Sequence, residues 1–227
     1  MTAPADIELS AIDLSEAAGH PFKAWLAAPE GIPKGAVVVL QEIFGVTEHI
    51  KAVVLEFASQ GYLAIAPSMF DYLEPGVALD YDEVDKGRSY KEACDPEQNI
   101  ADIKVAVAAV AHAGKVGAVG YCWGGGLAYL AACEAGVDAA VAYYGANIAL
   151  HLEREPRCPV MYHFGALDPL IPMSVVDNIQ AARPDDLFHI YPHSGHGFNC
   201  TDREDYNPED AATALDRTRA FFGRHLN

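Results

Sequence analysis

Short apolar runs alternate with helix-like segments along most of this chain, and this alternation constrains the fold more than any other feature. Residues 36–40, AVVVL, are all apolar, which is typical of a strand buried on both faces of a sheet. Similar strands are expected at 62–66, 115–120, 139–144, 160–164 and 187–191. Helices are expected between and after them, at 48–60, 96–112, 124–135, 174–182 and 208–225. This pattern predicts a mostly parallel sheet with helices on both faces.

Two segments depart from the alternation. Residues 6–14 and 21–27 have the pattern of an antiparallel hairpin, which would bring the sheet to about eight strands. Residues 69–95 are rich in Asp, Glu, Tyr and Gly, and we expect them to form an irregular excursion over the top of the sheet. The length of 227 residues fits one α/β domain, so we expect a single domain over residues 1–227.

The charge balance narrows the range of partners. Lys and Arg number 15 and Asp and Glu 32, so the net charge is −17, which argues against nucleic acid or an anionic membrane as a partner.

The uncharged run 116–133 reaches membrane length, but its five glycines favour a buried strand, a turn and a buried helix. The opening MTAPADIELS has no basic or apolar region of a signal peptide.

The cysteines indicate the redox state. There are five of them, an odd number, and none forms a CxxC pair. We therefore expect reduced thiols in a cytoplasmic protein, with no zinc site and no cofactor. A monomer is the simplest expectation, because a domain of this size buries its own core.

The motif GYCWG at 120–124 stands between a predicted strand and a predicted helix. It has the nucleophile-elbow form with Cys122 in place of serine. Small residues two positions before and after the nucleophile let the strand and helix approach, and the helix N-terminus favours a thiolate. The backbone N–H of Trp123 would then face a developing oxyanion. The alternative is an inert, buried cysteine in a glycine-rich turn.

Two more candidates follow later strands. Asp168 lies in GALDP after the strand at 160–164, and His196 lies in SGHGF after the strand at 187–191. A carboxylate in such a place accepts a hydrogen bond from an imidazole and fixes its tautomer. Each alone is also explained as an ordinary loop residue, and His193 competes as the base. Together, Cys122, Asp168 and His196 follow the chain order of the α/β-hydrolase fold.

The segment QEIFG at 41–45 follows the first buried strand. The loop at this place supplies the second oxyanion N–H in the α/β-hydrolase fold, and we assign it to Ile43. Glu42 would lie at the same end of the sheet as Cys122, where a carboxylate discourages thiolate formation unless something moves. The alternative for Glu42 is a pairing with a nearby cation.

Five motifs together resemble the dienelactone hydrolase family, over roughly residues 5–225: QEIFG, GYCWGG, YYG, GALD and GHGF. The resemblance implies that Cys122 is the nucleophile, His196 the base and then the acid, and Asp168 its orienting carboxylate. It implies a thioester acyl-enzyme held by the N–H groups of Ile43 and Trp123. It also implies a resting thiol paired with Glu42 until substrate displaces that carboxylate.

The resemblance further implies two arginines that hold a substrate carboxylate. Near the first position this chain has Lys86 and Arg88, which are explained equally well as solvated surface charges. At the second position it has Cys200, which cannot act as a cation, and Arg203 lies close enough in sequence to substitute. Aromatic residues that would line an apolar site, unless they belong to the core, are Phe44, Tyr90, Trp123, Tyr144 and Phe198.

The sequence thus predicts a cysteine-dependent hydrolase of small-molecule carboxylic esters or lactones. A general carboxylesterase or thioesterase of the same fold is a second possibility. A third is a non-catalytic thiol or redox binding module, against which the combination of Cys122, His196, Asp168 and Glu42 argues.

Overall fold

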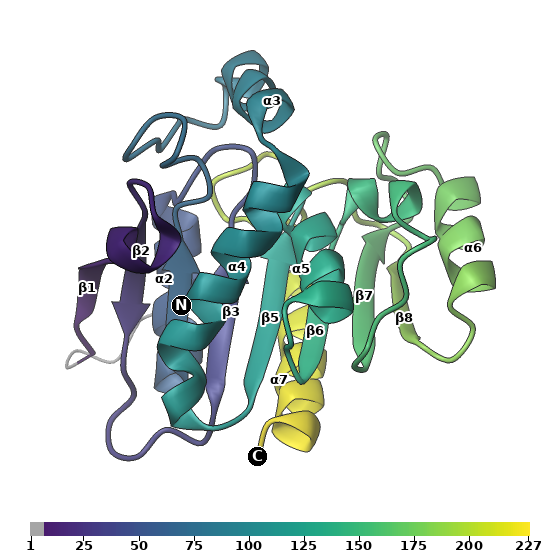
Figure 1. The fold of residues 1–227 in the computed structure, drawn as a ribbon. Helices are drawn as coiled ribbons and strands as arrows, with labels where there is room; N and C mark the ends of the chain where they lie inside the picture. Colours follow the sequence, from purple (N-terminus) through teal and green to yellow (C-terminus); the bar gives the residue numbers. More distant parts are fainter. Residues whose placement is uncertain (1–6) are drawn as a thin grey trace.

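The computed structural model describes residues 7–227 (Figure 1). Residue 6, the start of the predicted hairpin, and the first six residues of MTAPADIELS lie outside the described residues. The described residues form one sheet of eight strands in the order β1-β2-β4-β3-β5-β6-β7-β8. The strands are β1 (Leu9–Asp13), β2 (Lys23–Ala27), β3 (Ala36–Leu40), β4 (Leu63–Pro67), β5 (Val116–Tyr121), β6 (Ala139–Tyr143), β7 (Val160–Gly165) and β8 (Leu187–Tyr191).

The pairing of the strands confirms the predicted sheet. β1 and β2 pair antiparallel, as expected of the N-terminal hairpin, and β2 pairs antiparallel with β4. The pairs from β4 through β3, β5, β6 and β7 to β8 are all parallel. The carboxyl ends of β3, β5, β7 and β8 therefore meet at one edge of the sheet, where ligands of such folds bind.

Helices lie on both faces of this sheet (Figure 1). α4 and α5 cover one face and α2 and α7 the other, while α6 lies near the β8 end. The helices are α1 (Ser15–Ala18), α2 (Glu48–Ser59), α3 (Val84–Ala93), α4 (Pro96–Val110), α5 (Trp123–Glu134), α6 (Met173–Ala182) and α7 (Pro208–His225). Two short 3₁₀ turns are η1 (Ala111–Ala113) and η2 (Ala146–Leu150).

The core explains why β3 is apolar at every position. Val37 and Val39 belong to the cluster that includes Phe57 of α2 and Phe222 of α7. Val38, between them, belongs to the opposite cluster with the apolar residues of α4 and α5. Successive side chains of a strand point to opposite faces, so a strand covered on both sides needs an apolar residue at each position.

Side-chain caps fix where α2 and α4 begin. The Thr47 hydroxyl accepts a hydrogen bond from the Ile50 N–H at the start of α2. The Asp95 carboxylate accepts from the Glu97 N–H at 3.0 Å, and Pro96 takes the first helical position of α4, as the sequence predicted. Such caps satisfy N–H groups that have no partner within the helix.

Two helices were missed by the sequence analysis. The prediction of an irregular segment at 69–95 is wrong in part, because this segment contains α3. The only buried residue of α3 is Gly87, so the sequence VDKGRSYKEA shows no apolar stripe. The hairpin connection also contains the single turn α1, which buries none of its residues.

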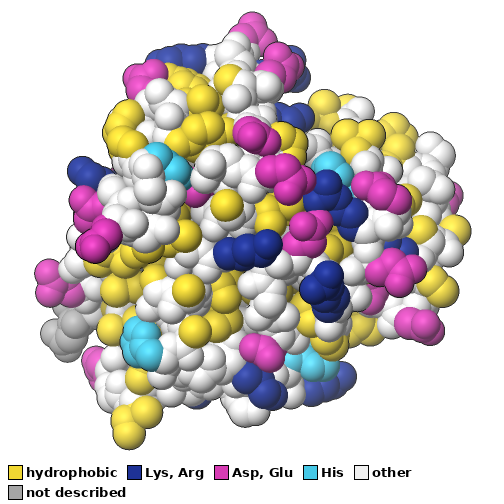
Figure 2. All heavy atoms as spheres, in the orientation of Figure 1, with side chains coloured by type: hydrophobic (Ala, Val, Ile, Leu, Met, Phe, Trp, Pro, Cys, Tyr) yellow, Lys and Arg dark blue, Asp and Glu magenta, His cyan; other side chains and the backbone are white. Residues whose placement is uncertain are grey.

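Acidic side chains are dispersed over the face of the molecule that α4 and α5 cover (Figure 2). On the face covered by α4 and α5, Figure 2 shows Asp and Glu side chains scattered between Lys and Arg. No single acidic patch gathers on that face. Between residues 7 and 227, none of the helices combines the length and the apolar content that crossing a membrane requires.

Candidate active site

Cys122 occupies a sharp turn between β5 and α5. Its backbone has φ 55° and ψ −117°, a region that side chains rarely adopt, and its N–H donates to the Tyr143 carbonyl at 3.0 Å. A Cβ at Gly120 would lie 1.8 Å from the Gly124 carbonyl oxygen, and one at Gly124 would lie 2.2 Å from the Leu40 carbonyl oxygen. The prediction that both flanking positions must be small is therefore confirmed.

A buried carboxylate and a buried histidine follow the last two strands, β7 and β8. Nδ1 of His196, after β8, is 2.8 Å from Oδ2 of Asp168, after β7. The other oxygen of Asp168 accepts from the N–H groups of Leu170 at 2.8 Å and Ile171 at 3.1 Å. These bonds hold the carboxylate, which in turn orients the ring. Within residues 7–227, Nε2 of His196 has no hydrogen-bond partner.

The surroundings of His196 favour its charged form. Burial acts to lower the pKa of His196, but the hydrogen bond that its Nδ1–H donates to Asp168 and the nearby Cys122 sulfur raise that pKa to about 10. His193, the competing base, is exposed to solvent and does not reach Asp168. The structure therefore brings together Cys122, His196 and Asp168, the three residues that the sequence combined.

The two predicted oxyanion donors come from different segments: Trp123 directly follows Cys122, and Ile43 lies in the loop after β3. The carbonyls of Leu40 and Gln41 lie close to Gly124, so the loop that carries Ile43 runs along the first turn of α5. In the described part of the chain, neither the Ile43 N–H nor the Trp123 N–H donates to a backbone or side-chain acceptor. Free N–H groups beside a nucleophile have the chemistry of an oxyanion hole.

Glu42 faces a cation. Its side chain is fully buried, and Oε1 lies 3.5 Å from Nη1 of Arg203. The structure thus shows Glu42 in the arrangement that the sequence analysis gave as the alternative. Burial acts to lower the pKa of Arg203, but Glu42 above all raises it beyond its ordinary value. The sequence named Arg203 only as a substitute for Cys200 and gave no sign of its contact with Glu42.

Other buried polar groups surround this pair. The Tyr144 hydroxyl and Nε2 of His49 are buried, and neither has a hydrogen-bond partner among the described residues. The Tyr144 ring lies 5.1 Å from the His196 ring. Burial lowers the pKa of His49, while Glu42 acts to raise it. His49 was missed, because a histidine in the first turn of α2 has no distinguishing sequence pattern.

The predicted substrate-binding cations do not gather at the site. Lys86 and Arg88 are both 55% exposed, and they face Glu83 and Asp85 of the same helical segment. Cys200 is fully buried, so it offers no surface to a ligand. Of the cations considered in the sequence, the structure places Arg203 beside the predicted catalytic residues.

The predicted aromatic residues are mostly packed. Phe44 is buried with its ring 4.7 Å from Tyr81, and Phe198 is buried with its ring 4.8 Å from Tyr191. Tyr90 is half-buried, and its hydroxyl donates to Glu74. The alternative that these rings belong to the core holds for four of the five, because Phe44, Trp123, Tyr144 and Phe198 are all buried in the core clusters.

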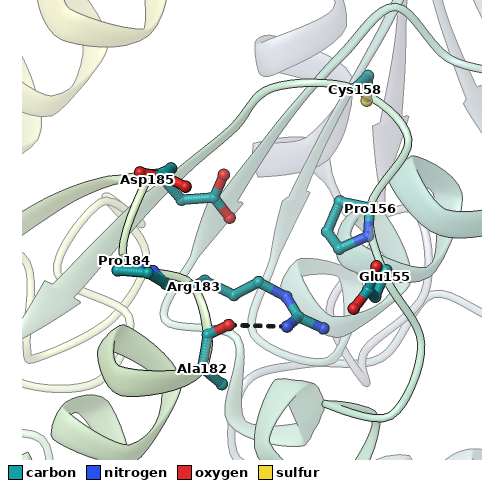
Figure 3. A pocket seen from close by; sticks show the side chains of 8 residues that line it. Glu155, Pro156, Cys158, Ala182, Arg183, Pro184 and Asp185 are labelled. Carbon is teal, nitrogen blue, oxygen red and sulfur yellow. Dashed lines mark hydrogen bonds between the residues drawn. The ribbon is translucent and has the colours of Figure 1, made fainter.

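Two hollows lie outside the turn at Cys122. The one in Figure 3, of about 200 Å³, lies at the amino ends of β7 and β8, and Arg183 there donates to the Ala182 carbonyl at 2.8 Å. It is at the opposite edge of the sheet from Cys122. A hollow of about 170 Å³ lies beside Trp123, and the polar residues that line it include Lys91, Asn99, Asn147 and His151. The sequence analysis identified neither.

The sheet order and the strand–turn–helix at Cys122, followed by an acid and a histidine after later strands, place the chain in the α/β-hydrolase class. The sequence profile of the dienelactone hydrolase family matches residues 22–226, and the chain belongs to that family. It is accordingly a hydrolase that acts on ester or lactone bonds.

Individual relatives agree with this assignment. A carboxymethylenebutenolidase of Pseudomonas putida is 35% identical over 215 residues, which cover 89% of this chain and 91% of the relative. Another, from Pseudomonas sp. strain P51, is 33% identical over 212 residues, covering 88% and 89%. The crystal structure of a candidate dienelactone hydrolase from Klebsiella pneumoniae has a TM-score of 0.86 at 28% identity and covers 96% of this chain and 99% of its own.

Proposed function

We propose that this protein hydrolyses small carboxylic esters or lactones through a thioester formed on Cys122. One observation carries the proposal. The His196 ring is held by Asp168 at 2.8 Å on one side, while its other nitrogen is free and buried next to the Cys122 sulfur, which raises the pKa of His196. This is the geometry of a nucleophile with a base oriented by a third group.

In the first half of the proposed reaction, the Cys122 thiolate attacks the carbonyl carbon and forms the C–S bond. The negative charge passes to the carbonyl oxygen, which the N–H groups of Ile43 and Trp123 bind. When the tetrahedral intermediate collapses, the bond to the alkoxy oxygen breaks and His196 gives its proton to that oxygen. A lactone opens in this step, and both parts stay attached through the thioester.

In the second half, neutral His196 takes a proton from water, and the hydroxide attacks the thioester carbonyl. The C–S bond breaks, the acid leaves, and the thiolate and imidazolium are restored. Asp168 stabilises the imidazolium at both stages through the bond to Nδ1.

Glu42 and Arg203 give the proposed site its control of substrate. A substrate carboxylate that pairs with Arg203 competes directly with Glu42 for this cation. The released Glu42 would then accept the thiol proton of Cys122, as the family resemblance implies, and return it to the thiolate when the product leaves. This step favours anionic esters such as a dienelactone carboxylate over neutral esters, with Arg203 in place of the cation missing at Cys200.

The first experiment compares hydrolysis of a dienelactone carboxylate by the wild type, Cys122→Ala and Cys158→Ala. Cys158 is a half-buried thiol at the amino end of β7, so it controls for the loss of a thiol as such. We expect Cys122→Ala to lose at least about 10³-fold in kcat, while Cys158→Ala retains wild-type turnover. Quenched-flow mass spectrometry of the wild type should show an acyl adduct on the peptide that contains Cys122.

Other outcomes select the alternatives. Esterase turnover that survives Cys122→Ala would overturn the thioester mechanism. Turnover of neutral esters or thioesters without the dienelactone would identify a general carboxylesterase or thioesterase of the same fold. A redox module predicts no repeated turnover without an added reductant, so sustained turnover excludes it.

A further inference from the structure

The surface helix α3 contains a glycine, Gly87, at a position where glycine lowers the stability of the helix. Gly87 lies inside the helix, between Lys86 and Arg88, and it is the only buried residue of α3. Alanine is more favourable than glycine at such a position, because glycine loses more conformational freedom on folding. Its backbone angles are not in the left-handed region, so conformation does not explain the glycine.

The reason for the glycine is a close approach to the oxyanion loop. A Cβ at Gly87 would lie 2.6 Å from the carbonyl oxygen of Ile43 and 3.2 Å from its Cγ1 atom. Contacts of 2.6 Å to a backbone atom do not occur without movement of one partner. The helix therefore rests on both the carbonyl and the side chain of the residue whose N–H is the proposed oxyanion donor.

Residues 77–79, just before α3, fasten the next part of the same loop. The Leu79 N–H donates to the Phe44 carbonyl at 2.8 Å. Gly45 pairs with Ala78, and its φ of 84° and a gap too small for a Cβ beside the Val77 carbonyl make glycine necessary there. We call residues 77–93 the clamp segment, because they hold the oxyanion loop at three consecutive residues.

The clamp segment also reaches the second oxyanion donor. The Tyr90 ring of α3 stacks on Phe70 with centroids 5.3 Å apart. Phe70 stacks on Trp123 with centroids 5.1 Å apart and the rings 11° from parallel. One segment therefore bears on both residues whose N–H groups would bind the developing charge.

We propose that Gly87 is a positioning residue for the hydrolysis, because the missing side chain lets α3 pack against Ile43 and fix the backbone of this residue on both sides of its Cα. The inference rests on the proposed function, in which the Ile43 N–H stabilises the oxyanion. Preorganised donors contribute most when they do not need to reorient during the reaction. A methyl group at position 87 would displace either α3 or the Ile43 carbonyl. Displacement of the carbonyl shifts the Ile43 backbone and so moves the N–H of this residue away from the charge.

Gly87→Ala tests the inference, with Ser89→Ala as the matched control. Ser89 is an exposed α3 residue, so its replacement changes the helix without reaching Ile43. We expect Gly87→Ala to lower kcat about tenfold or more with KM within about twofold, since one oxyanion donor contributes about 10²–10³-fold. Ser89→Ala should match the wild type in both constants.

A transition-state analogue separates positioning from general damage. An aryl trifluoromethyl ketone forms a hemithioketal oxyanion with a cysteine thiolate, so its affinity reports the oxyanion hole. The inhibition constant for this ketone should rise in Gly87→Ala by the same factor by which kcat/KM falls. The rate of Cys122 alkylation by iodoacetamide should remain that of the wild type, because the nucleophile is untouched.

Wild-type kcat and ketone affinity in Gly87→Ala would overturn the positioning role while leaving the Cys122 mechanism intact. Turnover that survives Cys122→Ala would instead overturn the proposed function itself. Should Gly87→Ala fail to fold, Ser89→Gly/Glu92→Gly loosens α3 from its exposed side without a clash. That variant should lower kcat a few-fold at unchanged KM, and an unchanged kcat would contradict the inference.

Discussion

Two buried histidines, one on β7 and one just after β8, differ in the groups that surround their ring nitrogens. His163 on β7 is fully buried, with Nδ1 2.8 Å from the Tyr191 hydroxyl and Nε2 3.1 Å from the Thr218 hydroxyl. His196 after β8 is nearly as buried, but one nitrogen meets a carboxylate and the other is free beside a thiol.

The pKa values of these histidines move in opposite directions. Burial, with smaller effects of His189 and Arg217, lowers the pKa of His163 well below its ordinary value. For His196 the same burial penalty is outweighed by Asp168 and Cys122. Burial alone therefore makes a histidine neutral and inert, and an adjacent carboxylate with a free second nitrogen makes it suited to proton transfer.

The largest expected effect is on the catalytic side of this comparison. We expect His196→Ala to lower kcat/KM about 10³-fold, since general acid–base catalysis contributes about 10²–10⁴-fold. The measurement is steady-state hydrolysis by protein shown to be folded by circular dichroism. His193→Ala is the control on the same loop and should leave kcat/KM unchanged. A comparable loss of kcat/KM in His193→Ala would indicate that His193, rather than His196, is the catalytic base.

Asp168→Asn should lower kcat/KM about 10²-fold and shift its pH dependence. The proposed leaving group is protonated by the imidazolium, so activity falls as pH rises through the pKa of His196, which is raised to about 10. Loss of the carboxylate lowers this pKa, so the alkaline decline should begin at lower pH. A pH profile of kcat/KM with an unmoved alkaline limb would contradict the assigned role of Asp168.

His163→Ala should show the opposite balance of effects. It leaves the Tyr191 hydroxyl buried without a partner, removes one of the two partners of the Thr218 hydroxyl and opens a void, which together cost about 2–4 kcal/mol in the free energy of unfolding. Turnover per folded molecule should stay within about twofold of the wild type. Urea unfolding and an activity assay measure the two quantities. A large loss of kcat at unchanged stability would make His163 part of the active site.

The smallest expected effect concerns a third histidine. Nε2 of His20 lies 2.8 Å from the buried Asp102, and although burial acts to lower the pKa of His20, the Pro21 carbonyl and Asp102 raise it. A raised folded pKa gives stability that is complete below about pH 6.5 and is lost as pH rises through the folded value. The difference in unfolding free energy between wild type and His20→Gln should thus be larger at about pH 5.5 than at about pH 8.5. Equal differences at both pH values would show that the charge of His20 contributes nothing.

The sheet and its major helices could be read from the chain because their patterns are local. The apolar run of β3 reflects burial on both faces, and Asp95 with Pro96 marks the start of α4. α3 escaped prediction because a polar helix that buries only Gly87 carries no apolar period. The contact that α3 makes with the rest of the protein at Gly87 is with Ile43, which is far away in the sequence.

The same division applies to the candidate site. Cys122 was recognisable because Gly120 and Gly124 are required by contacts within one strand–turn–helix unit. Asp168 and His196 were recognisable by their places after successive strands. The contact of Glu42 with Arg203 was not recognisable, because the sequence does not indicate which of two distant charged residues will pair in the fold.

Local patterns in the chain were enough to predict the mostly parallel sheet, the sharp turn at Cys122 and the order of the acid and histidine that follow it. These features depend on hydrophobic periodicity and on steric contacts between residues that are close together in the sequence, so a short stretch of sequence is enough to reveal each of them. Three other features are visible only in three dimensions: Arg203 faces Glu42, Lys86 and Arg88 face solvent, and Gly87 packs against Ile43. Those contacts join loops and helices from separate parts of the chain, and their geometry is set by how the layers of the fold pack together.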